Sequence, residues 1–70
     1  MIGVVGLGFV GLTTALGFAE KGIMVTAVDN DQNKISTINR GEIPFWEPGL
    51  KDALNRHLDK LFHPTSEYEH

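Results

Sequence analysis

The chain contains no cysteine, so it offers no disulfide, no thiolate ligand for a metal and no cysteine nucleophile. This absence is compatible with a reducing cytoplasm, where we expect the protein to act. Basic residues are also few, with 6 lysines and arginines against 9 acidic residues and a net charge of −3. Because a nucleic-acid partner requires a clustered basic face, we expect no nucleic-acid binding.

Other features are missing as well. The three histidines, His57, His63 and His70, share no metal-ligand spacing, and we expect no metal site. No nucleophile and base, and no pair of carboxylates, stand at a spacing that indicates catalysis, so we expect no catalytic residue in this chain. Residues 1–19 carry no charge, but several glycines interrupt them and no basic segment precedes them. We therefore expect neither a signal peptide nor a membrane span.

The strongest positive feature is a short apolar run, residues 2–5, that leads into three glycines spaced G-x-G-x-x-G. In a dinucleotide site each glycine has a physical reason. Gly6 allows a sharp turn off a strand, Gly8 allows the backbone to approach a pyrophosphate, and Gly11 allows close packing of helix on strand. The motif alone is weak, but the β-branched residues before it predict a strand buried on both faces.

The segments after the glycines supply the rest of this pattern. Leu12, Ala15, Leu16 and Ala19 recur on one face of a predicted helix, which Lys21 and Gly22 end. A second apolar run, residues 24–28, ends at Asp29, 18 residues after Gly11. A carboxylate there can accept the hydroxyls of an adenosine ribose and would repel a 2′-phosphate, which predicts NAD rather than NADP. The alternative is that Asp29 is an ordinary turn residue.

A second helix is predicted from Asp31, as its cap, to Gly41, with Ile35 and Ile38 as its apolar stripe. Lys34 lies five residues beyond Asp29 and could reach the same ribose or its phosphate. An equally good interpretation of Lys34 is a solvated surface lysine.

The last third of the chain predicts a loop, a helix and a strand. Phe45 and Trp46 in the loop either pin it to the core or form part of a ligand wall. The helix begins near Pro48, and one of its faces carries Leu50, Ala53, Leu54, His57, Leu58 and Leu61. Residues 61–65 predict a third strand, and Pro64 assigns it to a sheet edge.

Together these elements predict an α/β fold of the Rossmann type. Its parallel strands lie in the order 3-2-1, with an additional helix before the third strand. Seventy residues suffice for one small domain and no more.

Two motifs carry a resemblance to a known family. The glycine segment GLGFVGL (residues 6–12) and the segment NRGEIPFWEPGL (residues 39–50) resemble the N-terminus of the UDP-glucose/GDP-mannose dehydrogenase family. Residues 18–22 and 28–31 extend the resemblance over essentially the whole chain. The second motif is the more selective one. Phe9 and Trp46 stand where the family usually has tyrosine, which removes a possible hydroxyl contact.

The resemblance implies an enzyme that oxidises the C6 hydroxyl of a nucleotide sugar, of the UDP-glucose or UDP-N-acetylmannosamine type, to a carboxylate while two NAD are reduced. It also implies that residues 1–70 are the N-terminal part of an NAD-binding Rossmann domain, and that the rest of this domain, a linker helix and the UDP-sugar domain lie outside this chain. The family's catalytic residues lie downstream, so this chain is expected to be inactive alone and to hold the adenosine and pyrophosphate of NAD. The expected cofactor-binding residues are Gly6, Leu7, Gly8, Phe9, Val10, Gly11, Asp29 and Lys34.

The expected partners follow from the same resemblance. The nucleotide sugar would be contacted only by parts outside this chain, and the intact protein is expected to be a homo-oligomer. The first strand would lack a neighbour on its outer edge, so we expect the chain itself to self-associate. Two alternatives remain open, a free-standing module that binds NAD or another adenine nucleotide, and a fragment of a β-hydroxyacid-type dehydrogenase.

Overall fold

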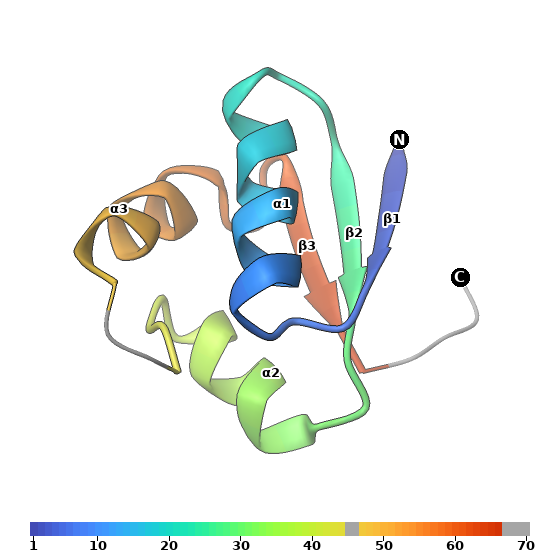
Figure 1. Ribbon diagram of the computed structural model, residues 1–70, viewed down its shortest axis with the longest axis vertical. Helices are drawn as coiled ribbons and strands as arrows, with labels where there is room; N and C mark the ends of the chain where they lie inside the picture. The colour runs from blue at the N-terminus through green and yellow to red at the C-terminus, as the bar shows by residue number, and fades with distance from the viewer. Residues whose placement is uncertain (45–46, 67–70) are drawn as a thin grey trace.

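The structure, a computed structural model, describes residues 1–44 and 47–66 of the 70-residue chain. Strands and helices follow one another as the sequence predicts (Figure 1). In chain order they are β1 (Ile2–Val5), α1 (Phe9–Glu20), β2 (Val25–Val28), α2 (Gln32–Asn39), α3 (Pro48–His57) and β3 (Phe62–Thr65).

The three strands form one parallel sheet in the order β1-β2-β3. The register pairs Ile2 with Val25, and Val25 with Phe62. All three strands therefore end at the same edge of the sheet, where the glycine loop (residues 6–11, which include the start of α1) and α2 lie in Figure 1. The predicted strand order 3-2-1, with an extra helix before the third strand, is confirmed.

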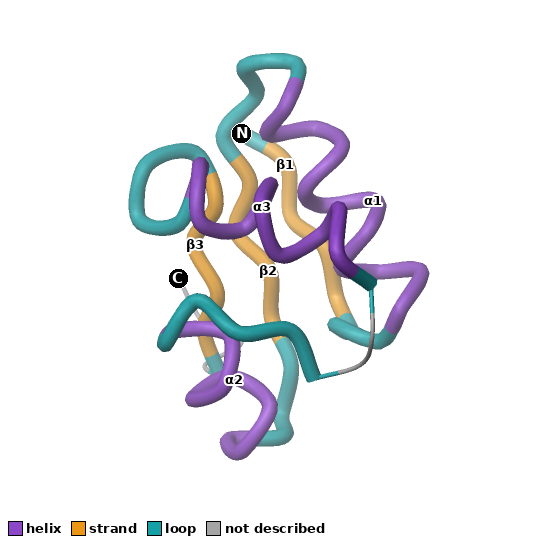
Figure 2. The backbone as a smooth tube through the Cα atoms, turned by 90° about the vertical axis from the view of Figure 1, so that its left-hand side faces the viewer, coloured by secondary structure: helices purple, strands orange, loops and turns teal. Residues whose placement is uncertain are grey.

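The helices lie together on one face of the sheet (Figure 2). Right-handed crossovers that run in one direction along a sheet place their helices on the same side, which explains this arrangement. The core fills the space between helices and sheet, and the predicted apolar faces of α1 and α2 are confirmed. Its buried members are Leu7, Leu12, Ala15, Leu16, Ala19, Val25, Ala27, Ile35, Ile38, Ala53, Leu54 and Phe62.

The prediction that the first strand is buried on both faces is wrong for this chain. Burial along β1 alternates, and Val5 is 71% exposed. Val28, its partner in the register, is only half-buried although β2 is the central strand. In the described residues no helix covers the second face, so side chains that point to that side remain in contact with solvent.

The predicted ends of two helices are confirmed. Asp31 is the N-cap of α2, and its side chain accepts a hydrogen bond from the Lys34 backbone N–H. Gly22 and Gly41 follow α1 and α2 with positive φ, and each donates its N–H to a carbonyl of the preceding helix.

The third helix ends earlier than its apolar pattern indicates. It stops at His57, and Leu58 and Leu61 lie in the turn that leads to β3. Asp59 adopts a left-handed φ of 62°, which reverses the chain, and the strand then begins at Phe62 rather than at Leu61. Both leucines still pack against the core, so their apolar character reflects burial in the turn. The alternatives for Phe45 and Trp46 fall outside the described residues.

No helix in the two described ranges is long and apolar enough to cross a bilayer.

Candidate functional site

The glycine loop leaves β1 at the carboxyl edge of the sheet and enters α1 directly (Figure 1). Gly6 has a φ of 91°, in the region that favours glycine, and its N–H donates to the Val28 carbonyl at 2.7 Å. The next residue, Leu7, places its side chain in the core with no exposed surface. The loop is thus attached to the sheet while its following residues face outward.

Gly11 is tightly packed against the chain, whereas Gly8 has space around it. A Cβ atom at Gly11 would lie 1.9 Å from the Gly6 carbonyl oxygen, so the close approach of α1 to the loop requires glycine there. A Cβ at Gly8 would meet nothing within 4 Å. The backbone at Gly8 therefore borders open space, as a backbone site for a diphosphate requires.

The start of α1 suits an anion electrostatically. Its N-cap is Gly8, which has no side chain, and no acidic residue lies in its first turn. The partial positive charge of the helix N-terminus is therefore not offset by the helix itself. Phe9 and Val10, the first two residues of α1, are 55% and 75% exposed, so neither is buried in the core.

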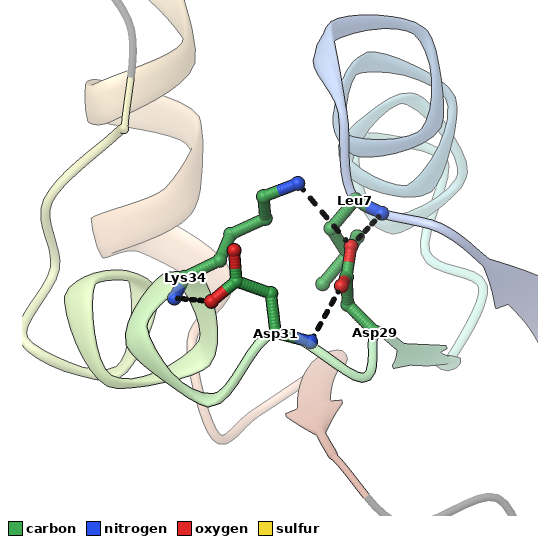
Figure 3. A network of polar contacts seen from close by, with 4 residues as sticks. All are labelled: Leu7, Asp29, Asp31 and Lys34. Atoms are coloured by element: carbon green, nitrogen blue, oxygen red, sulfur yellow. Dashed lines mark hydrogen bonds and ion pairs between the residues drawn. The ribbon is translucent and has the colours of Figure 1, made fainter.

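Asp29 comes directly after β2 and lies beside this loop (Figure 3). Only 8% of the residue is exposed. Its Oδ2 accepts a hydrogen bond from the Leu7 N–H at 2.8 Å, and its Oδ1 accepts one from the Asp31 N–H at 2.9 Å. The Lys34 ammonium lies 3.4 Å from Oδ2. One carboxylate thus joins the first loop, the turn after β2 and the first turn of α2.

These contacts keep Asp29 ionised. The Leu7 N–H and, after it, the Asp31 N–H hold the pKa of the Asp29 carboxyl below its ordinary value. Burial opposes this effect, and the Lys34 ammonium adds to it. A stable negative charge therefore stands at the end of β2, beside the glycine loop.

The structure brings together the residues that the sequence singled out for a dinucleotide. Gly6 to Gly11 form one loop and helix start, and Asp29 and Lys34 stand beside it. The bond from Leu7 to Asp29 and the contribution of Asp31 were not predicted. The sequence does carry a signal for the contact between Asp29 and Asp31. An aspartate side chain in a turn commonly accepts the backbone N–H of the residue two positions later.

His57 and His63 take no part in this site. Within residues 1–44 and 47–66, no three histidine, aspartate or glutamate side chains could share a metal ion. His57 Nε2 lies 3.4 Å from a Glu20 carboxylate oxygen, and His63 Nε2 lies 3.0 Å from the Lys60 carbonyl. His70 falls outside the described residues.

Comparison with known proteins gives a consistent result. The family model for the NAD-binding domain of the UDP-glucose/GDP-mannose dehydrogenase family matches residues 1–70. The chain is 51% identical over 61 residues to the UDP-N-acetyl-D-mannosamine dehydrogenase of Escherichia coli (strain K12), covering 87% of this chain and 14% of that protein. It is 46% identical over 56 residues to the UDP-glucose 6-dehydrogenase of Pseudomonas aeruginosa, covering 80% and 12%.

A solved structure agrees with these sequence relatives. The UDP-N-acetyl-mannosamine dehydrogenase Cap5O from Staphylococcus aureus superposes with a TM-score of 0.89 at 35% identity, covering 97% of this chain and 17% of that one. The chain therefore spans less than a fifth of each of these three relatives.

Proposed function

Because the chain belongs to the UDP-glucose/GDP-mannose dehydrogenase family, we propose that it is the first part of the NAD-binding domain of a nucleotide-sugar 6-dehydrogenase. Its cofactor is NAD. In this proposal residues 1–70 hold the adenosine and pyrophosphate of NAD, and the remainder of the domain and the sugar-binding parts lie elsewhere in the intact protein. The glycine loop, residues 6–11, receives the pyrophosphate, and Asp29 and Lys34 receive the ribose.

The observation that carries the proposal is the ionised Asp29 beside the open backbone at Gly8. A carboxylate has about four lone-pair positions for hydrogen bonds. The Leu7 N–H, the Asp31 N–H and the Lys34 ammonium use three of them. One position on Oδ1 remains for a ribose hydroxyl, and displacement of Lys34 from Oδ2 would provide another. Lys34, 27% exposed in its side chain, would then be placed to contact the ligand.

The activity proposed for the intact protein is oxidation of the C6 hydroxyl of a UDP-sugar to a carboxylate, with reduction of two NAD. NAD, when bound, accepts the hydride, and this chain contributes by fixing and orienting the adenosine half of the cofactor. Residues 1–70 provide no catalytic group in this proposal, and the 70-residue chain alone is expected to be inactive. The names of both curated relatives support this choice over a β-hydroxyacid-type dehydrogenase.

Two further features of the intact protein belong to the proposal. The nucleotide sugar would bind through other parts of the polypeptide, and the intact enzyme would be a homo-oligomer. Its place would be the cytoplasm, with which the absence of cysteine in this chain is compatible.

Calorimetric titration of the chain with NAD and with NADP tests the cofactor site. We expect NAD to bind more tightly, because the Asp29 carboxylate repels a 2′-phosphate. Asp29→Ala should weaken NAD binding by about 1–3 kcal/mol, which is the scale for loss of charge-assisted hydrogen bonds. Gln32→Ala, an exposed substitution at the start of α2, serves as the control and should leave NAD binding unchanged. Equal affinity for NAD and NADP in the wild type would contradict the proposed role of Asp29.

A further inference from the structure

We propose that Asp29 is a positioning residue for the glycine loop, residues 6–11, and that it sets this loop for a diphosphate independently of any contact with a ribose. The inference rests on the proposed function of the loop as the pyrophosphate site. It adds a second role to Asp29, in which the carboxylate acts on the ligand through the Leu7 backbone.

The loop is held to the end of β2 at two consecutive residues. The Gly6 N–H donates to the Val28 carbonyl at 2.7 Å, and the Leu7 N–H donates to Asp29 Oδ2 at 2.8 Å. The Leu7 side chain is at the same time fully buried in the core. Leu7 is therefore fixed from both sides, and the residue that follows it is Gly8, whose backbone borders open space.

The carboxylate itself is fixed in orientation. Its other oxygen, Oδ1, accepts the Asp31 N–H at 2.9 Å, and its side chain is only 10% exposed. Asp31 in turn caps α2 by accepting the Lys34 N–H at 3.1 Å. Figure 3 shows the resulting connection from the loop through Asp29 to the first turn of α2. A carboxylate that served only to bind a ribose would not need to accept a hydrogen bond from the Leu7 backbone N–H.

Loss of the Asp29 carboxylate would leave the Leu7 N–H without its charged acceptor. In Asp29→Asn the amide has one acceptor oxygen for the Leu7 and Asp31 N–H groups, so the bond that remains is uncharged and the other N–H faces the amide NH2 group. A buried donor without a partner is costly, so the glycine loop and the turn after β2 could not both keep their positions. Movement of the loop would disturb the backbone that meets the diphosphate. Binding of a ligand with no ribose would then weaken, which a role confined to the ribose does not predict.

The test uses inorganic pyrophosphate and NAD as separate ligands of the ¹⁵N-labelled 70-residue chain, followed by the backbone amide signals of residues 6–11. We compare wild type, Asp29→Asn and Asp31→Asn. The Asp31→Asn control removes a neighbouring negative charge while asparagine keeps the N-cap. By charge alone both variants should bind pyrophosphate at least as tightly as wild type.

We expect Asp29→Asn to bind pyrophosphate about tenfold more weakly than wild type, as loss of one charge-assisted bond implies. Asp31→Asn should not weaken this binding. If Asp29→Asn loses NAD affinity but binds pyrophosphate as Asp31→Asn does, the positioning role is overturned while the proposed function stands. If the wild-type loop amides respond to neither ligand, the proposed function fails, and the positioning role fails with it.

A measurement on the wild type covers the case in which Asp29→Asn does not fold. The Leu7 amide proton should move when the Asp29 carboxylate is protonated, because its hydrogen bond then loses a charged acceptor. This change should follow the same acid titration as the Asp29 side-chain carbon signal. A Leu7 amide that does not respond to this titration would overturn the proposal.

Discussion

At the scale of single residues, the site depends on two glycines with different physical roles. Gly6 supplies a backbone conformation with a φ of 91°, and Gly11 supplies the absence of a side chain where α1 meets the loop. A methyl group at Gly11 would overlap a backbone carbonyl, which cannot rotate away as a flexible side chain can. The helix would have to move off the loop, and its N-terminus would move with it.

Gly11→Ala should therefore destabilise the fold by about 1–3 kcal/mol, the usual cost of overpacking. Gly17→Ala is the matched control in the same helix, because a Cβ there meets nothing within 4 Å. It should stabilise the chain by about 0.5–1 kcal/mol through the higher helix propensity of alanine. Urea denaturation of the two variants measures both effects. Equal stability of the two would contradict the packing argument.

At the scale of elements, the order of strands and helices was predictable because hydrophobic periodicity and glycine spacing are local properties. Asp29 at the end of β2 and Asp31 at the start of α2 were likewise predicted from position alone. The bond from Asp29 to Leu7 was not predictable. It joins residues 22 positions apart, and only the folded register brings β1 and β2 side by side.

The end of α3 shows a second limit of the sequence pattern. Leu58 and Leu61 continue the helical spacing, yet the chain reverses after His57. Leu58 and Leu61 keep the helical spacing of apolar residues because the turn packs on the same core as the helix. A pattern of apolar residues reports which side chains are buried and does not distinguish a last helical turn from a packed reverse turn.

Asn55 links α3 to the residue that follows the end of α2. Its Nδ2 donates to the Gly41 carbonyl and to the Lys51 carbonyl, each at 2.9 Å. Asn55→Ala should cost about 1 kcal/mol of stability, because the Gly41 carbonyl loses its side-chain partner in a partly buried position. Asn33→Ala, at an exposed site in α2, should be neutral or slightly stabilising. Thermal unfolding compares the two, and an equal effect would show that the Asn55 contacts contribute nothing.

At the scale of the whole molecule, helices cover the sheet on one of its two faces within the described residues. In these residues β1 pairs only with β2. Val5 belongs to this edge strand, and it is 71% exposed. An apolar, unpaired edge is a template for pairing with another chain, which is the physical basis for the expected self-association.

Sedimentation and light scattering over a concentration series test this expectation. We expect the wild-type chain to form larger species as concentration rises. Val5→Lys should reduce this association, because a lysine on an edge strand opposes pairing with a second edge. Gln32→Lys changes the net charge equally at an exposed site on α2, away from this edge, and should associate as wild type does. A wild-type chain that stays monomeric throughout, or equal effects of the two lysines, would show that the edge of β1 does not drive association.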